Sequence, residues 1–131
     1  MNYTIKDVCK KLNLTVHTVR RYCDMGLVPN LRHDKKGNRI FDEESINWLQ
    51  AAKFLRASRL SIPEIRHYFT LCKQENATIR ERQEILINLR TESQKKLEEM
   101  QMHIDCLSDK ISHLQNVMDS DGVDDCNPLN W

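Results

Sequence analysis

Two adjacent arginines in the stretch LTVHTVRRYCDMGLV (residues 14–28) have the chemistry best suited to an anionic partner. The planar guanidinium of arginine forms two hydrogen bonds at once with a phosphate or with the edge of a guanine base. Thr15 is placed to cap a helix in which one face is shared by His17, Arg20, Arg21 and Asp24. That helix predicts a contact with nucleic acid, although an amphipathic surface helix without a ligand has the same pattern.

The five cysteines and five histidines form no recognisable catalytic or metal-binding motif. The cysteines are odd in number and widely spaced, and none belongs to a C-x-x-C pair, so we expect reduced thiols rather than disulfides. Neither a Gly-rich phosphate loop nor a plausible pair of nucleophile and base is visible. The sequence therefore predicts no enzyme, no cofactor and no metal site.

Charge is distributed unevenly along the 131 residues, with 14 Lys/Arg against 8 Asp/Glu in residues 1–78 and 6 against 11 in residues 79–131. A basic first part is expected of a nucleic-acid-binding protein, although solvated charged faces give the same imbalance. No stretch approaches the roughly 18 to 20 consecutive apolar residues of a membrane helix, and the first residues lack the apolar centre of a secretion signal. We expect a cytoplasmic protein that does not bind a membrane.

The first 41 residues predict two short helices and a small hairpin. In IKDVCKKL the apolar residues recur with helical spacing, Thr4 is a suitable N-cap, and Asn13 suits the tight turn before the next helix. Residues 30–41 contain short extended runs on either side of a turn in which Gly37 can adopt positive φ. Two helices joined by a tight turn, the second with a basic face, predict a helix-turn-helix motif.

Two further helices are expected after the hairpin. Asp42 is placed to begin one that continues to about Ser58, and Ser61 with Glu64 predicts a capping box at the start of the next. The buried face expected for this last helix consists of Ile62, Ile65, Phe69 and Cys72.

A much longer helix is predicted to begin at a second capping box, Thr78 with Glu81, because no Gly or Pro interrupts the chain before about Met118. Some forty residues at 1.5 Å each make a rod of about 60 Å. Apolar residues alternate at intervals of three and four along its second half, which is the seam of a coiled coil, and a second copy of the chain can complete it. The predicted dimerisation residues are Leu97, Met100, Ile104, Leu107, Ile111, Leu114 and Met118.

As a set, these features resemble the MerR family of bacterial transcription regulators. The resemblance is carried by YTIKDV, LTVHTVRRYCDMGLV, GNRIF, DEESINWL and LRASRLSIPEI, in the family's order, and it covers residues 2 to about 118. It implies a mostly α fold with a winged helix-turn-helix head, two further helices and a long C-terminal helix that forms an antiparallel coiled coil between protomers. We expect a DNA-binding domain over residues 1–75, a dimerisation helix over 76–118 and an acidic, flexible tail over 119–131 that ends in Trp131.

The helix pattern and the resemblance together predict a DNA-binding set. The resemblance implies that Thr18 and Arg20 lie on the recognition helix, that Tyr22 faces phosphate, and that Arg39 and Phe41 lie on the wing. The full set is Thr4, Thr15, His17, Thr18, Arg20, Arg21, Tyr22, Arg32, Lys35, Lys36, Arg39 and Phe41.

Four positions depart from the family pattern. Arg21 stands where an aromatic residue is usual, Cys23 where an acid is usual, Asn13 where glycine is usual and Phe41 where tyrosine is usual. Phe41 lacks a hydroxyl that could bond a phosphate, whereas Arg21 adds a charge. DNA binding is still expected, but an operator sequence cannot be borrowed from relatives.

The resemblance also implies a mechanism, in which a homodimer binds a pseudo-palindromic promoter and bends and untwists it so that RNA polymerase engages both promoter elements. Contacts at two half-sites then supply the free energy for a deformation that costs several kcal/mol. The partners expected are double-stranded promoter DNA, a second copy of the chain and RNA polymerase in the bacterial cytoplasm. The alternative is an architectural DNA-binding protein with the same head and coiled coil but without promoter control.

The signal that such a regulator senses is less evident from the sequence. Metal-sensing relatives have a cysteine at the start of the long helix and a pair after it, whereas this chain has residues 76–78 without cysteine and only Cys126 in the tail. Phe54 lies near the position of the cysteine in thiol-responsive relatives. Cys72 and Cys106 are the candidate sensors that remain, although lone helical cysteines are more often structural. Trp48, Tyr68 and Phe69 could line a pocket for an unidentified small-molecule effector, although core packing is the default expectation for all three.

Overall fold

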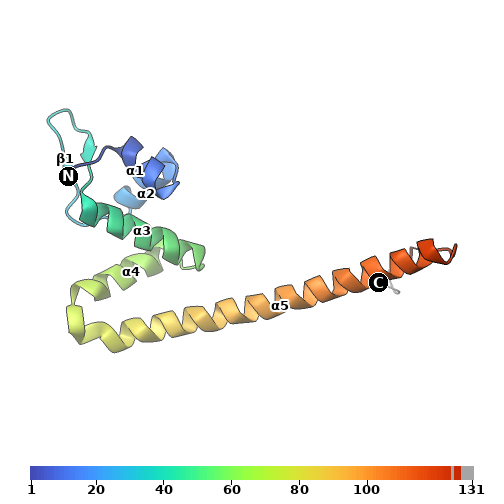
Figure 1. Ribbon diagram of the computed structural model, residues 1–131. Coiled ribbons are helices and arrows are strands. Elements are labelled where there is room, and N and C mark those ends of the chain that lie inside the picture. The colour runs from blue at the N-terminus through green and yellow to red at the C-terminus, as the bar shows by residue number, and fades with distance from the viewer. Residues whose placement is uncertain (125, 128–131) are drawn as a thin grey trace. The chain divides into compact units, whose positions relative to one another are not determined.

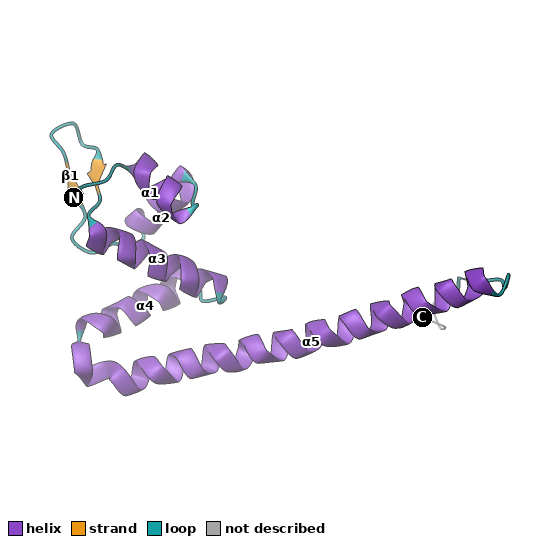
Figure 2. Ribbon diagram, viewed as in Figure 1, coloured by secondary structure: helices purple, strands orange, loops and turns teal. Residues whose placement is uncertain are grey.

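The computed structural model of this chain describes residues 1–124 and 126–127 (Figure 1). It separates into two units, which we call the head (Met1–Leu86) and the stalk (from Ile87 onwards). As predicted, the fold is mostly helical, with a small two-stranded wing and a long C-terminal helix (Figure 2). No helix among the described residues is long and apolar enough to cross a membrane.

The first two helices are α1 (Ile5–Leu12) and α2 (Val16–Asp24). Thr4 caps α1, since its hydroxyl accepts a hydrogen bond from the Asp7 amide while the Asp7 carboxylate accepts one from the Thr4 amide. Asn13 has φ +53°, the left-handed conformation that the turn was predicted to need. The helix-turn-helix prediction is therefore confirmed, including its capping residues.

The wing consists of the antiparallel strands β1 (Arg32–His33) and β2 (Arg39–Ile40). Asp34 Oδ1 accepts hydrogen bonds from the amides of Lys36 and Asn38, both at 2.9 Å, and Gly37 has φ +82°. Phe41 joins the base of the wing to the N-terminus, because the backbones of Phe41 and Tyr3 exchange two hydrogen bonds of 2.6 and 3.0 Å. The predicted hairpin is thus present and is attached at its base.

Two more helices, α3 (Glu43–Ala57) and α4 (Ile62–Lys73), complete the head. Asp42 caps α3, and the predicted capping box between Ser61 and Glu64 is present at the start of α4. Lys53 Nζ donates to the carbonyl of Leu12 at 2.6 Å and so ties α3 to the end of α1. The core between the helices consists mainly of Val8, Leu12, Val19, Tyr22, Leu27, Phe41, Ile46, Leu49, Leu55, Ile65 and Phe69.

The expected buried face of α4 needs one correction. Ile62, Ile65 and Phe69 are buried as predicted, but Leu71 is buried as well and Cys72 is only half-buried. The prediction used only the helical spacing within α4. Leu71 is covered because the chain turns back after Gln74, and the Thr78 hydroxyl donates to the Leu71 carbonyl.

The junction between α4 and the long helix also differs from the prediction. A short 3-10 helix, η1 (Glu75–Thr78), precedes α5 (Ile79–Asp119). Thr78 lies inside this turn rather than before it, so it does not form the predicted capping box with Glu81. Its buried hydroxyl instead donates to the carbonyl of Leu71 at 2.6 Å and accepts from Arg82 Nε at 3.1 Å.

The predicted long uninterrupted helix is present as α5, which starts within the residues of the head and supplies residues 87–119 of the stalk, and none of its residues is buried. All seven seam residues are 38 to 68% exposed, with Leu97 the most exposed and Leu114 the least. Trp131 and the end of the predicted tail lie outside the described residues. The head therefore has a core of its own, whereas the stalk exposes its apolar face.

Candidate nucleic-acid interface

A groove of about 630 Å³ lies on the head between the start of α1, the helix α2 and the wing. It is lined by Asn2, Tyr3, Thr4, Ile5, Lys6, Arg20, Asp34, Gly37, Asn38, Arg39 and Ile40. Three cationic side chains from three elements, Lys6, Arg20 and Arg39, thus meet at one concave surface. Such a surface can hold a chain of phosphates.

The helix α2 buries one face and exposes the other. Val19 and Tyr22 are buried, whereas His17, Arg20 and Arg21 are exposed. The polar face predicted from the sequence is therefore the solvent-exposed face of this helix. Of its three members, only Arg20 lines the groove.

Three threonines in the predicted set act on the backbone at the helix starts. Thr4 and Thr15 are the N-caps of α1 and α2. The hydroxyl of Thr15 accepts from the Thr18 amide at 3.1 Å and donates to the Thr18 hydroxyl at 2.8 Å. These bonds fix the first turn of α2 and hold the Thr18 side chain beside its cap.

Two aromatic residues of the predicted set do not reach the surface. The exposed fraction is 6% for Tyr22 and 0% for Phe41. The burial of Tyr22 does not fit the phosphate-facing position expected for it, whereas Phe41, expected on the wing, lies directly after β2. Both rings bury a large apolar area in the small core of the head, where Phe41 also anchors the wing.

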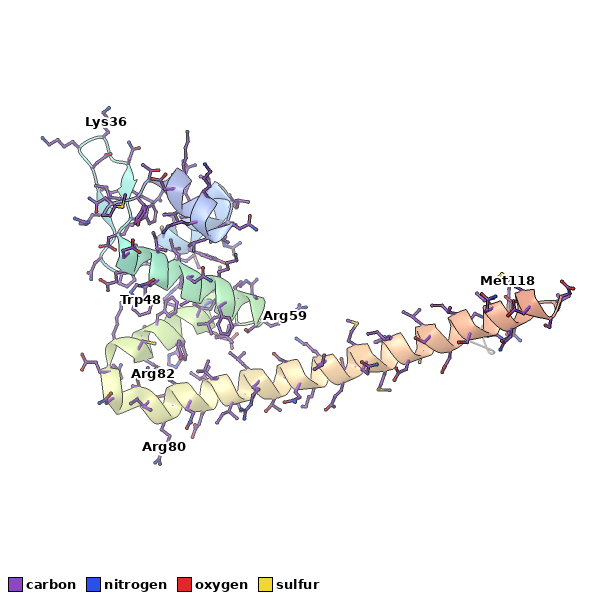
Figure 3. All side chains as sticks on the ribbon, viewed as in Figure 1. Lys36, Trp48, Arg59, Arg80, Arg82 and Met118 are labelled. Carbon is purple, nitrogen blue, oxygen red and sulfur yellow. The ribbon has the colours of Figure 1, made fainter. Side chains whose placement is uncertain are left out.

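The basic residues of the wing fall into two groups. Lys35 and Lys36 are exposed at its turn, where Lys36 points away from the ribbon (Figure 3). Arg32 donates to Asn2 Oδ1 at 3.1 Å and lies 3.9 Å from Asp42 Oδ2, while Arg39 Nη2 lies 2.7 Å from Asp24 Oδ1. The turn lysines are thus available to a ligand, and the strand arginines connect the wing to the rest of the head.

Several carboxylates around this surface have a lowered pKa for a local reason. Backbone amides of Asn38 and Lys36 lower the pKa of Asp34, and the amide and hydroxyl of Ser45 lower that of Asp42. Both carboxylates therefore remain ionised at a lower pH than an ordinary aspartate does. Their charges belong to the turn and the cap that shape the wing.

Sequence reasoning missed three residues that contribute to this surface. Lys6 and Asn38 line the groove, and Asp24 pairs with Arg39. A basic residue in the first turn of α1 was a usable signal for Lys6. Helical spacing placed Asp24 on the polar face of its helix, but nothing local indicated that it pairs with Arg39, 15 residues away in the sequence.

The cysteines show no shared site. Cys9, Cys23 and Cys72 are half-buried, while Cys106 and Cys126 are exposed. Burial raises the pKa of Cys23 to about 11, which disfavours its thiolate. Within residues 1–124 and 126–127, no group of three His, Cys, Asp or Glu side chains could hold a metal ion.

The aromatic residues expected to line an effector pocket are packing residues in the head. The rings of Trp48 and Phe69 meet edge to face, with centroids 4.7 Å apart, and Phe69 is buried. Tyr68 is half-buried, and its pKa is raised mainly by that burial. These contacts join α3 to α4.

Comparison with known protein families finds relatives that share this architecture. The model of the MerR HTH family of regulatory proteins matches residues 3–72, which include the helix-turn-helix, the wing, α3 and most of α4. The transcriptional regulator AdhR of Bacillus subtilis is 36% identical over 86 residues, covering 66% of this chain and 61% of AdhR. An uncharacterised HTH-type transcriptional regulator of Haemophilus influenzae is 27% identical over 115 residues, covering 88% of this chain and 85% of the relative.

Solved structures resemble the chain over a greater length. HiNmlR, a MerR family regulator lacking the sensor domain and bound to promoter DNA, superposes with a TM-score of 0.83 and 26% identity, over 94% of this chain and 93% of HiNmlR. A MerR family regulator from Listeria monocytogenes superposes with a TM-score of 0.77 and 28% identity, over 90% and 92% of the two chains. The chain belongs to the MerR family of helix-turn-helix transcriptional regulators.

Proposed function

We propose that this chain is a homodimeric, sequence-specific DNA-binding regulator that distorts promoter DNA in response to a cellular signal. The observation that carries the proposal is the groove where Lys6, Arg20 and Arg39 converge from α1, α2 and the wing. The promoter DNA bound by HiNmlR, which resembles this chain over nearly its whole length, supports the same function.

In this proposal α2 enters the major groove and the wing contacts the neighbouring backbone. His17, Arg20 and Arg21 form the exposed face of α2, and Arg20 is placed to read a base edge or grip a phosphate. Lys35 and Lys36 at the wing turn supply phosphate contacts, which add affinity but little sequence preference.

The dimer is proposed from the apolar seam of the stalk. Seven large apolar side chains exposed along one helical stripe favour association with a second helix of the same kind. A two-fold axis between antiparallel copies makes the interface self-complementary. On this proposal residues 1–75 are the DNA-binding domain and residues 76–118 the dimerisation helix.

Distortion of the promoter follows from joining two heads. Two recognition helices and two wings are then held at a set separation. Their contacts with the two half-sites supply binding free energy that offsets the cost of deforming the DNA. The proposed consequence is that RNA polymerase engages promoter elements whose spacing is otherwise unfavourable.

We propose that the signal acts either by modifying a cysteine thiol or by binding as a small molecule. Cys106 is exposed and Cys72 is half-buried, so an oxidant or electrophile has direct access to Cys106. Replacement of all five cysteines by serine tests every thiol model at once, because a response that survives it excludes them.

Footprinting combined with in vitro transcription from the gene's own promoter tests the proposed function. Protection of one site between the promoter elements, with altered transcript yield, is expected of a regulator. Many dispersed protected sites without an effect on transcription contradict promoter control and favour the architectural alternative.

A further inference from the structure

Asp24 occupies a position where a carboxylate is unfavourable on two grounds. It is the last residue of α2, where the helix dipole disfavours negative charge. It also lies near a groove that is lined by cationic side chains and proposed to hold phosphate. A specific interaction is therefore needed to account for its place.

That interaction is with Arg39. Arg39 Nη2 lies 2.7 Å from Asp24 Oδ1, the length of a charge-assisted hydrogen bond. The Arg39 side chain is 26% exposed, whereas that of Asp24 is 66% exposed. The pair connects strand β2 of the wing directly to the end of α2.

The other contacts of the wing with the head lie nearer its base, where Arg32 donates to Asn2 Oδ1 and approaches Asp42. Its ladder has two residue pairs, Arg32 with Ile40 and His33 with Arg39, and so short a ribbon is marginal by itself. Phe41 anchors only the base, through its buried ring and its bridge to Tyr3. Arg39 is in the pair closest to the turn, so a contact there restrains the outer end of the wing.

The two members of the pair differ in their exposure to solvent. The Arg39 side chain is largely shielded, whereas the Asp24 carboxylate faces mostly solvent. Because one partner is exposed, the contribution of the pair is expected to be modest, as for other ion pairs at a protein surface.

We propose that Asp24 is a positioning residue, whose carboxylate holds Arg39 and thereby orients the wing against the recognition helix α2. The inference deepens the proposed function and rests on it for its effect on DNA. With the wing restrained at both ends, Lys35 and Lys36 meet the DNA backbone in register with Arg20. Arg39 then acts mainly within the protein, and the turn lysines supply the charge of the wing.

A simpler role for Arg39, as a phosphate ligand with Asp24 as a bystander, makes a different prediction. Asp24→Asn would then remove one repulsive charge and strengthen binding to every duplex by the same factor. If Asp24 instead positions the wing, the same substitution leaves nonspecific binding unchanged or stronger, while binding to the preferred sequence weakens.

The test uses the full-length chain with Asp24→Asn, the charge-swapped variant Asp24→Arg with Arg39→Asp, and Glu84→Gln as control. Glu84 is an exposed carboxylate of α5 that forms no ion pair among the described residues. Circular dichroism establishes that each variant is folded. The first measurement is the heteronuclear 15N NOE of wing amides 34–38 in the free protein.

We expect the NOE values of the wing to fall in Asp24→Asn, to recover in the swapped variant and to stay at wild-type level in Glu84→Gln. The second measurement compares affinity for a duplex that the wild-type chain selects from a random pool with affinity for a scrambled duplex. The ratio is expected to fall about two- to fivefold in Asp24→Asn, the effect of losing a partly exposed ion pair.

Unchanged wing NOE values in Asp24→Asn overturn the inference, whatever happens on DNA. An equal gain in affinity for both duplexes overturns it as well and assigns Arg39 to phosphate. A wild-type chain that selects no duplex contradicts the proposed function instead, and the NOE measurement then decides alone whether Asp24 positions the wing.

Discussion

The head and the stalk differ in how far they bury their apolar side chains. In the head, α1 to α4 and the wing share a core in which Val8, Val19 and Leu49 are fully buried. In the stalk, the seven seam residues of α5 are 38 to 68% exposed within one chain. The difference teaches that the head is stabilised by its own tertiary contacts, whereas the stalk has no core within the single chain, which is why we propose a dimer.

Disrupting the seam should have the largest effect and should leave the head intact. Ile104→Lys with Leu107→Lys is expected to weaken the proposed dimer by roughly 6 to 12 kcal/mol, because four apolar side chains in the dimer lose their burial. Sedimentation velocity measures the dissociation. Met102→Lys is the matched control, since Met102 is 67% exposed but lies off the seam. Equal losses in both variants would contradict a dimer built on these seven residues.

A cavity in the core of the head should have the next largest effect. Leu49→Ala removes a side chain that is 0% exposed and is expected to lower the free energy of unfolding of the head by about 2 to 5 kcal/mol. Thermal unfolding followed by near-ultraviolet circular dichroism reports on Trp48 nearby. Phe54→Ala in the same helix, at a residue 62% exposed, should change stability by less than about 0.5 kcal/mol. A large loss in Phe54→Ala would mean that a partner covers this residue.

Removing the Arg20 side chain from the groove should weaken DNA binding without changing the fold of the head or of the stalk. Arg20→Ala is expected to weaken binding of the selected duplex by about 1 to 3 kcal/mol if Arg20 reads a base. A gel-shift titration at physiological salt measures this loss. Arg80→Ala, at an exposed arginine outside the groove (Figure 3), is the control. An Arg20→Ala affinity that matches wild type removes this residue from the interface.

Acid should act on the caps of the head, with the smallest effect. The pKa of Asp42 is lowered mainly by the Ser45 amide, so the ionised carboxylate stabilises the folded state. Its contribution is complete above the pKa of the unfolded chain, near pH 4, and is lost as the pH falls through the lower folded value. Asp42→Asn should therefore flatten the fall in melting temperature below about pH 4. Asp109→Asn in the stalk should leave that fall unchanged, and the opposite pattern would contradict the assignment of the cap.

The sequence predictions were most accurate for features that depend on residues close together in the sequence. Thr4, Thr15 and Ser61 were correctly predicted as caps because the bonds of a cap span three residues. Asn13 and Gly37 were identified by the positive φ that their turns need. The Thr78 capping box was wrong, because Thr78 lies inside η1 and its hydroxyl donates to the carbonyl of Leu71 and accepts from Arg82 instead.

The candidate surface was predicted in part. The exposed face of α2 follows from helical periodicity, so His17, Arg20 and Arg21 were placed correctly on one side. Tyr22 and Phe41 were assigned to the surface by resemblance, and their burial shows that the core of the head claims both rings. In the head, Tyr22 packs under α2 and Phe41 attaches the wing at its base.

The sequence by itself determined the elements of this protein: five helices, a hairpin wing, their caps and the apolar stripe of the stalk. Each of these depends on residues within a few positions of one another, which is the range of turns, caps and helical periodicity. Only the tertiary structure decided which cationic side chains meet at one groove, which aromatic rings are buried, and that Asp24 binds Arg39. These contacts join residues from different elements, and local patterns contain no information about such pairs until the core has brought the elements together.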